Sequence, residues 1–276
     1  MLFAFLASVV TPAAVLTDAR ADDGRLVPVR GVRLYTEVIG HGPPVLFLHG
    51  GLDYFDDAFP HQKAYLSTFR TVIGVDQRGH GHSPDNEQPF SYRQMADDTA
   101  ALLEQLGVGP VDVVGHSDGG NVALVLARFH PERVRRIIVS GANVRGDYNG
   151  WLDYLRFLLL PSGQFVASLP AAMRDQYVRV SPDGADHWAV VAAKSKDLWS
   201  ARTVLDRSDL AQIRAPVLVM AGDRDVIPAE HTVEIFRGLP HAELCILPAT
   251  GHGTMTERPE EFNKIVREFL ERPEDP

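Results

Sequence analysis

Hydrophobic and polar positions along the chain alternate in short blocks. Apolar runs of strand length recur, and stretches with apolar residues at helical spacing separate several of them. The expected strands cover residues 33–40, 44–51, 69–77, 111–117, 134–142, 216–223 and 242–249, and the expected helices cover 91–107, 117 to about 130, and 259 onward. Short apolar strands alternating with helices predict an α/β fold, in which a mostly parallel sheet is covered by helices on both faces.

Residues 143–206 interrupt this alternation. They contain all three tryptophans, no convincing strand, and a helix-like run, YLRFLLLPSGQF. We therefore expect a helical lid inserted into a core made of residues 22–142 and 207–276. Its aromatic side chains can either dock the insertion onto the core or line a substrate pocket. The candidates for the second role are Trp151, Trp188 and Trp199.

The first 21 residues have the pattern of a secretory signal. An apolar run from Leu2 to Leu16 is too short to span a bilayer comfortably, and Ala19-Arg20-Ala21 offers a small-residue cleavage site after it. The expected location is therefore secreted or periplasmic. No Lys or Arg precedes the apolar run, so the alternative is a disordered leader, or a wrongly assigned start, on a cytoplasmic protein.

Composition narrows the classes of partner. The formal net charge is −9, and we find no basic patch of the kind that nucleic acids or anionic membranes require. We expect no nucleic-acid partner and no integral membrane association after signal cleavage. The single cysteine, Cys245, excludes an intrachain disulfide.

One serine lies where a predicted strand meets a predicted helix, in the segment Gly115-His116-Ser117-Asp118-Gly119. A sharp strand-to-helix turn presents the serine hydroxyl at the carboxyl edge of a sheet, and small flanking residues avoid collisions there. The first amides of the helix point to the same place, where negative charge can develop. A serine that merely caps the helix has the same local pattern, so the partners decide between the two.

A serine nucleophile needs a base, and the base needs an orienting carboxylate. Asp223 and Asp225 follow a predicted strand, and His252 lies between the last strand and the last helix. The chain order is serine, aspartate, histidine, each after a different strand. This arrangement favours a catalytic role for Ser117 and His252 over the alternative that His252 is simply a solvent-exposed residue in a loop.

The chain resembles the α/β-hydrolase-fold serine hydrolases from about Val27 to Leu270. The matching segments are LHGG (48–51), DQRGHGHS (76–83), GHSDGG (115–120) and GDRDVIP with the later GHG. The resemblance implies Ser117 as nucleophile, His252 as base and Asp225, three residues after Gly222, as the acid in preference to Asp223. It also implies an oxyanion hole made by the backbone N–H groups of Gly51 and Asp118.

No cofactor follows from this resemblance, and we expect no metal. His80 and His82 alternate as metal ligands could, but the family's turn is Arg-Gly-x-Gly-x-Ser with both x positions variable. No cysteine, and no carboxylate at ligand spacing beyond Asp76, supports a metal site.

Two interpretations remain open for the side chain of Asp118. A carboxylate in the first turn of a helix is stabilised by about 0.3–1 kcal/mol through the helix dipole, which is a sufficient explanation. Alternatively, the carboxylate faces the acyl pocket and pairs with an ammonium group on the substrate, as on an amino-acid ester.

The expected activity is hydrolysis of an ester, or a related acyl bond, of a small molecule through an acyl-enzyme. Acyl transfer or cofactor-free perhydrolysis would use the same triad with another acceptor. A receptor-like member of the fold would keep the triad for recognition. Fold alone does not choose among these alternatives.

Overall fold

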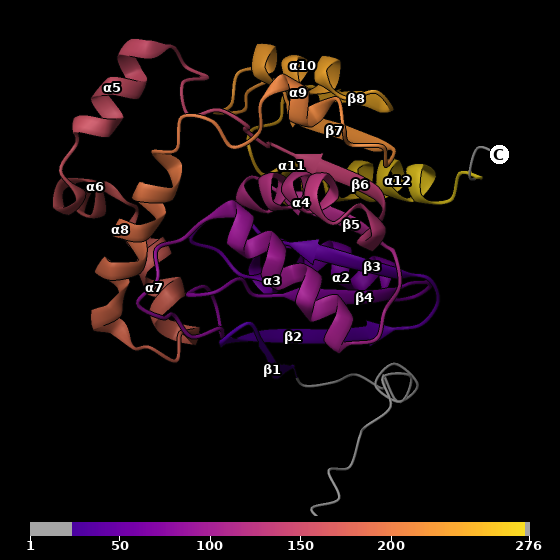
Figure 1. Cartoon of the computed structure of the whole chain (residues 1–276), viewed down its shortest axis with the longest axis horizontal. Helices are drawn as coiled ribbons and strands as arrows, with labels where there is room; N and C mark the ends of the chain where they lie inside the picture. The colour runs from indigo at the N-terminus through magenta and orange to yellow at the C-terminus, as the bar shows by residue number, and fades with distance from the viewer. Residues whose placement is uncertain (1–23, 274–276) are drawn as a thin grey trace, which may run out of the picture.

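The computed structural model describes residues 24–273, so the predicted signal segment lies outside the described residues. An eight-stranded sheet runs through the molecule in the order β1-β2-β4-β3-β5-β6-β7-β8 (Figure 1). Strands β3 to β8 are parallel, and β2 is antiparallel to both β1 and β4. The strands are β1 (Arg25–Val29), β2 (Val32–Gly40), β3 (Pro44–Leu48), β4 (Thr71–Val75), β5 (Val111–His116), β6 (Val134–Ser140), β7 (Val217–Gly222) and β8 (Ala242–Leu247).

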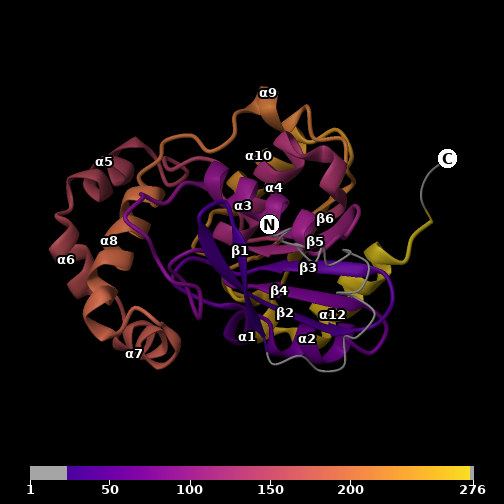
Figure 2. The same cartoon turned by 60° about the horizontal axis from the view of Figure 1, so that its bottom comes forward.

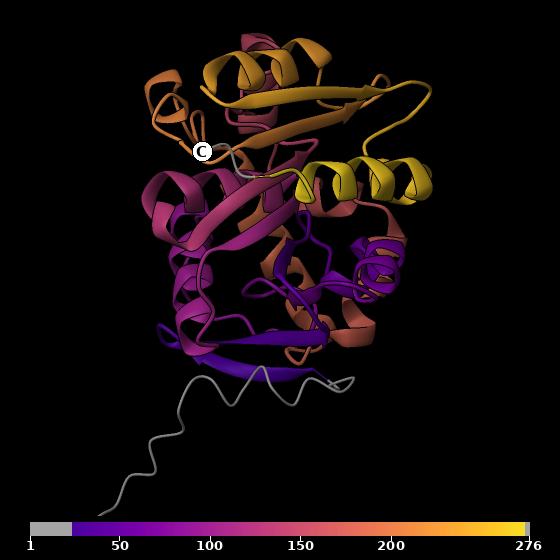
Figure 3. The same ribbon diagram turned by 90° about the vertical axis from the view of Figure 1, so that its right-hand side faces the viewer.

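Helices cover both faces of the sheet (Figure 3). One apolar cluster joins α3 (Tyr92–Gln105), α4 (Asp118–Phe129) and α10 (Ala229–Gly238) to one face. A second joins α1 (Phe55–Ala58), α2 (Pro60–Leu66) and α12 (Pro259–Leu270) to the other. Neighbouring strand residues alternate between the clusters: Leu46 faces the first and Phe47 the second. Both faces are buried, which explains why the central strands appear in the sequence as continuous apolar runs.

Local signals fix where several helices begin and end. Gly107 follows α3 with a φ of 67°, a left-handed conformation that glycine adopts at little cost. Pro259 occupies the first position of α12, where its missing N–H is not needed. The α/β fold predicted from the pattern is confirmed. The structure adds β1 and several short helices that the pattern did not indicate, including α9 (Arg207–Leu210) and α11 (Thr254–Glu257).

Between β6 and β7 the chain leaves the sheet and forms a helical insertion, residues 143–206. Its helices are α5 (Trp151–Leu159), α6 (Ser162–Ser168), α7 (Ala171–Val180) and α8 (Trp188–Trp199). Figure 2 shows them as an arc along one side of the sheet and its covering helices. Among the described residues, no helix has the length and apolar character needed to cross a membrane.

Candidate active site

Ser117 occupies a strained turn between β5 and α4. Its φ of 51° and ψ of −118° are unusual for a residue with a side chain. Its N–H donates to the Ser140 carbonyl oxygen at 2.8 Å, which fixes the turn against β6. A Cβ on Gly115 would overlap the Gly119 carbonyl oxygen, and one on Gly119 would overlap the Leu48 carbonyl oxygen. The flanking glycines therefore allow the close backbone approach that holds the strained serine.

A carboxylate orients His252. The His252 ring nitrogen Nδ1 lies 2.7 Å from Asp225 Oδ1, and the Asp225 side chain is only 1% exposed. The backbone N–H of Ile227 donates to the same oxygen at 2.8 Å, so the carboxylate is itself held in place. If Nδ1 carries the proton, Nε2 of His252 is free to accept one.

Asp223, the other carboxylate considered, has a different role. Its Oδ1 accepts the backbone N–H of Thr250 at 3.1 Å. Hydrogen bonds from the backbone of Ala249 and Thr250 lower the pKa of Asp223 below its usual value. Asp223 thus shapes the loop before His252, whereas Asp225 contacts the imidazole.

Ser117 and His252 line one cleft of about 330 Å³ at the carboxyl edge of the sheet. Asp118, Val226 and Ile227 also line the cleft and, like Ser117 and His252, lie outside the helical insertion. The helical insertion supplies the remaining wall: Asn143, Gly146, Tyr148, Asn149, Asp153, Tyr154, Phe157 and Trp199. This size lies at the lower end of the range for small-molecule sites.

The histidine before the nucleophile keeps positive charge away from His252. The His116 ring centroid lies 4.7 Å from that of His252. Burial, and secondarily the neighbouring His252, lowers the pKa of His116 to about 3. His116 is therefore neutral at neutral pH and adds no positive charge beside His252.

The loop after β3 lies directly against the nucleophile turn. A Cβ on Gly50 would lie 3.4 Å from Ser117 Cβ, and one on Gly51 would overlap Asp118 Oδ2 and lie 2.6 Å from Trp199 Cζ2. A side chain at position 51 would have to displace the Asp118 carboxylate and the Trp199 ring. The two backbone segments that the resemblance assigned to an oxyanion hole, at Gly51 and Asp118, are thus close neighbours beside Ser117.

His49 organises this loop, although the sequence analysis did not single it out. Its Nδ1 lies 2.7 Å from the Gly50 carbonyl oxygen, and its Nε2 lies 2.9 Å from the Gln77 N–H. Because Nε2 must accept from the amide, Nδ1 carries the proton and donates to Gly50. Burial lowers the pKa of His49 to about 4, which keeps this neutral form. The sequence feature that could have indicated this role is the position of His49 directly before two glycines, at the end of a predicted strand.

The Asp118 carboxylate has two protein partners. Tyr92 Oη donates to Oδ1 at 2.6 Å, and Trp199 Nε1 donates to Oδ2 at 2.7 Å. Burial raises the pKa of Asp118, and the hydrogen bonds from Trp199 and Tyr92 oppose this rise. Asp118 does begin a helix, as the first sequence interpretation required, and it also borders the cleft. Its bond to Trp199 fastens the end of α8 to the nucleophile turn.

The three tryptophans proposed from the sequence lie in different surroundings. Trp199 lines the cleft. Trp151 is 51% exposed, with the Arg202 guanidinium over its ring, and lies outside the residues that line the cleft. Trp188 is buried within the insertion against Tyr177, also away from the cleft. The difference follows from helix position: Trp199 ends α8 next to Asp118, whereas Trp188 begins that helix.

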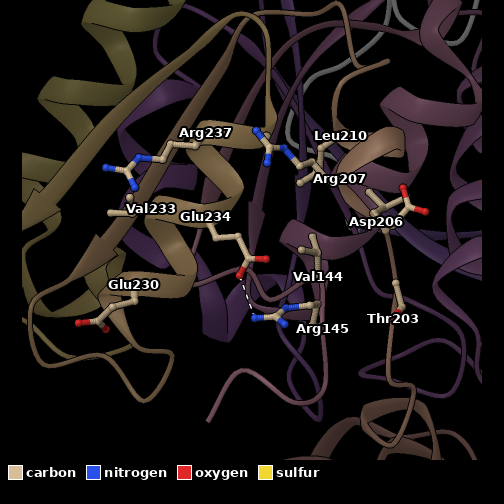
Figure 4. Close-up of a pocket in the computed structure, with 12 residues that line it drawn as sticks. Val144, Arg145, Thr203, Asp206, Arg207, Leu210, Glu230, Val233, Glu234 and Arg237 are labelled. Atoms are coloured by element: carbon tan, nitrogen blue, oxygen red, sulfur yellow. Dashed lines mark hydrogen bonds and ion pairs between the residues drawn. The ribbon is translucent and has the colours of Figure 1, made fainter. Parts of the chain in front are cut away.

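A second cavity, of about 380 Å³, lies where the helical insertion joins the core. Figure 4 shows the ion pair between Arg145 and Glu234 of α10, at 2.9 Å, crossing it. Arg145 and Thr203, from the two ends of the insertion, form an isolated antiparallel bridge, and the Val204 N–H donates to the Val144 carbonyl oxygen at 2.8 Å. This cavity marks the base at which the insertion is fastened.

His80 and His82 make contacts within their own loop. His80 Nδ1 lies 2.9 Å from the Arg78 carbonyl oxygen, and His82 Nδ1 lies 2.9 Å from Asp76 Oδ2. Across residues 24–273, no group of three or more histidine, cysteine or acidic side chains is arranged to hold a metal ion.

The fold and this cleft agree with the family to which the chain belongs. Residues 45–265 match the alpha/beta hydrolase family, so the protein is a member of that family. It is 27% identical over 271 residues to the 2-hydroxymuconate semialdehyde hydrolase of Pseudomonas putida, an alignment that covers 90% of this chain and 94% of that protein. It is 28% identical over 254 residues to the serine hydrolase BPHL of Homo sapiens, covering 89% and 85% of the two chains.

A solved structure gives the same result. Est816, described as an N-acyl homoserine lactone degrading enzyme, matches with a TM-score of 0.72 and 26% identity over 89% of this chain and 100% of its own. The two named relatives are hydrolases, and the solved structure is described as a lactone-degrading enzyme.

Proposed function

We propose that the protein hydrolyses an ester or lactone of a small neutral molecule through an acyl-enzyme on Ser117. The observation that carries the proposal is the cleft itself. It is lined by a serine in a strained strand-to-helix turn and by a histidine whose Nδ1 is held 2.7 Å from a buried carboxylate. These are the parts that acyl transfer to serine needs.

In the proposed reaction, Ser117 Oγ attacks the carbonyl carbon and His252 Nε2 takes the serine proton. The backbone N–H groups of Gly51 and Asp118 stabilise the oxyanion that forms. Collapse of this intermediate breaks the bond to the leaving alcohol, which receives the proton from His252. Water then attacks the acyl carbon and gives its proton to His252. The second collapse releases the carboxylic acid and returns the proton to Ser117.

The lining of the cleft favours a neutral substrate with an apolar part. Tyr148, Tyr154, Phe157 and Ile227 contribute apolar surface. The Asp118 carboxylate is already bonded to Tyr92 and Trp199, and Asp153 pairs with Arg156 at 2.8 Å. Both carboxylates thus already have protein partners, and the support for a neutral substrate comes chiefly from the apolar lining.

The test has two steps. A fluorophosphonate probe should label wild type and fail to label Ser117→Ala. Chromogenic esters of increasing acyl length, a matched ester with an α-ammonium group and a set of lactones should then show preference for a neutral substrate. Labelling of the alanine variant would contradict the proposal. So would wild-type enzyme that the probe labels but that turns over no ester and no lactone. Adding an alcohol or peroxide acceptor separates hydrolysis from acyl transfer and perhydrolysis by the product formed.

We also propose, from the sequence alone, that residues 1–21 direct export and are removed. The apolar run Leu2 to Leu16 and the Ala19-Arg20-Ala21 site support this proposal. Expression with the native leader in a bacterial host should give an exported chain whose intact mass corresponds to a start at Asp22. A cytosolic chain that keeps the leader would contradict it.

A further inference from the structure

Gln77 lies just beyond the carboxyl end of β4, beside the loop that carries Gly50 and Gly51. Its backbone N–H donates to His49 Nε2 at 2.9 Å. The residue is only 3% exposed. The reaction proposed above does not use its side chain.

The side-chain amide of Gln77 is buried without a protein partner. Among the described residues, neither Oε1 nor Nε2 has a hydrogen-bond partner. Leaving a buried polar group unsatisfied costs about 1–3 kcal/mol, and the great majority of such groups in folded proteins are bonded. An amide with both ends in this state can bind a polar molecule from outside the chain.

Gln77 is one of the residues that line a small cavity beside the Gly50–Gly51 segment. His49, His80 and Asp118 also line it, and most of its exposed surface is apolar. About 10 Å³ of it is open to the centre of a water molecule, which is close to the space that one buried water needs. His80 Nδ1 faces the Arg78 carbonyl oxygen and so carries the proton, which leaves Nε2 as an acceptor.

We propose that this cavity binds one water molecule, held by the Gln77 amide, and that Gln77 is thereby a positioning residue for Gly51. The bound water would find its other partners on His80 and Asp118. The water would support the Gly50–Gly51 segment, which lines the same cavity. Without the amide and its water, the segment can relax into the cavity and move the Gly51 N–H away from the oxyanion.

This inference rests on the proposed acyl-enzyme chemistry and predicts a particular kinetic effect. An oxyanion donor acts on charge that develops in the transition state, so its displacement lowers kcat and leaves KM unchanged. Removing such a donor costs about 100- to 1,000-fold, and displacing it should cost less, about tenfold in kcat.

The kinetic test compares Gln77→Met, which keeps side-chain length and removes the amide, with Asn263→Leu. Asn263 on α12 is also buried, and its Oδ1 likewise lacks a partner among residues 24–273. We expect kcat to fall about tenfold with unchanged KM in Gln77→Met, and to stay at the wild-type value in Asn263→Leu. An unchanged kcat in Gln77→Met, a rise in KM alone, or equal kcat losses in both variants would overturn the positioning role.

Crystallography tests the water site independently of activity. A high-resolution structure of wild type should show one ordered water within hydrogen-bond distance of the Gln77 amide, and Gln77→Met should lack it. A wild-type cavity without an ordered water overturns the site. If Ser117 fails to label, the proposed function fails while the crystallographic result still decides whether the cavity binds water.

Discussion

The cleft has two walls that are held in different ways. The sheet-derived wall carries Ser117 and His252 at the ends of strands, and backbone hydrogen bonds and close glycine contacts fix its turns. The wall from the helical insertion is made of residues from the segment before α5, such as Tyr148, and from α5 and α8, such as Phe157 and Trp199. One tie between this wall and the nucleophile turn is the bond from Trp199 to Asp118. Positions set by the backbone suit chemistry, whereas side chains on a separate layer suit selection of the substrate.

The largest difference between the walls should appear when Ser117 is removed. Ser117→Ala should lower kcat by about 10⁶-fold, since losing the nucleophile of a triad costs about as much as losing the whole triad. The folded structure should persist, because the Ser117 backbone N–H bond to Ser140 remains. Steady-state kinetics with a thermal-unfolding control measure both. Activity within tenfold of wild type would assign the chemistry to another residue.

The second prediction compares the two aspartates near the sheet edge. Asp225→Asn should lower kcat by about 10⁴-fold, because the amide no longer fixes the histidine tautomer. Asp223→Asn is the matched control. This variant loses only loop hydrogen bonds from Thr250 and its neighbour. The fall in kcat should therefore be smaller than in Asp225→Asn by a factor of about 100 or more. A larger effect at Asp223 would reverse the assignment of the acid.

Changes in the wall from the insertion should alter preference more than chemistry. Trp199→Phe removes the N–H donor to Asp118 and trims the cleft wall. We expect about a tenfold change in the relative kcat/KM of short and bulky acyl groups, equivalent to about 1.4 kcal/mol. Trp151→Phe is the control, since Trp151 is exposed outside the cleft. Identical acyl profiles for Trp199→Phe and wild type would show that this wall does not select.

Asp118→Asn sharpens the same comparison. It keeps the backbone N–H beside Ser117 and weakens the charge-assisted bonds from Tyr92 and Trp199. Such bonds contribute about 1.5–3 kcal/mol, so kcat/KM should fall about tenfold or more. The loss should be equal for a neutral ester and its α-ammonium analogue. A loss confined to the ammonium ester would restore the interpretation in which Asp118 pairs with the substrate.

The smallest effect concerns acid stability. His49 and His116 have folded pKa values of about 4 and about 3, so below pH 6.5 the unfolded chain binds their protons first. Stability that is full above pH 6.5 is then lost as pH falls towards 4, at about 1.4 kcal/mol per pH unit for each histidine. Asp53, bonded to Gln176 of α7, opposes this loss because burial raises its pKa to about 7.

Asp53→Asn should therefore steepen the loss. The stability contributed by a protonated Asp53 is full below pH 3.8 and lost as pH rises through 7. Without it, the free energy of unfolding should decline between pH 6.5 and 4.5 by about 1.4 kcal/mol per unit more than in wild type. Urea unfolding at several pH values measures both curves. Parallel curves would show that the pKa of the Asp53 carboxyl is not raised in solution.

The sequence by itself determined the sheet and the order of the reactive groups. Strands buried on both faces appear as continuous apolar runs, so β3 to β7 could be located from hydrophobicity alone. Carboxyl ends of parallel strands share one edge, which predicted that Ser117 and His252 would lie near each other. The edge strand β1 was missed because Pro28 disrupts its apolar run. Proline is tolerated in an edge strand.

Only the tertiary structure decided which side chains meet across distant segments. Tyr92 and Trp199 are 26 and 81 residues from Asp118, and both reach its carboxylate. No local pattern distinguishes Trp199 from Trp151 or Trp188, because burial and contact depend on how α5 and α8 lie against the core. The unpartnered Gln77 amide likewise becomes visible only when its neighbours are in place. Periodicity records which face of an element is buried, whereas side-chain partnerships depend on the packing of elements that the chain separates.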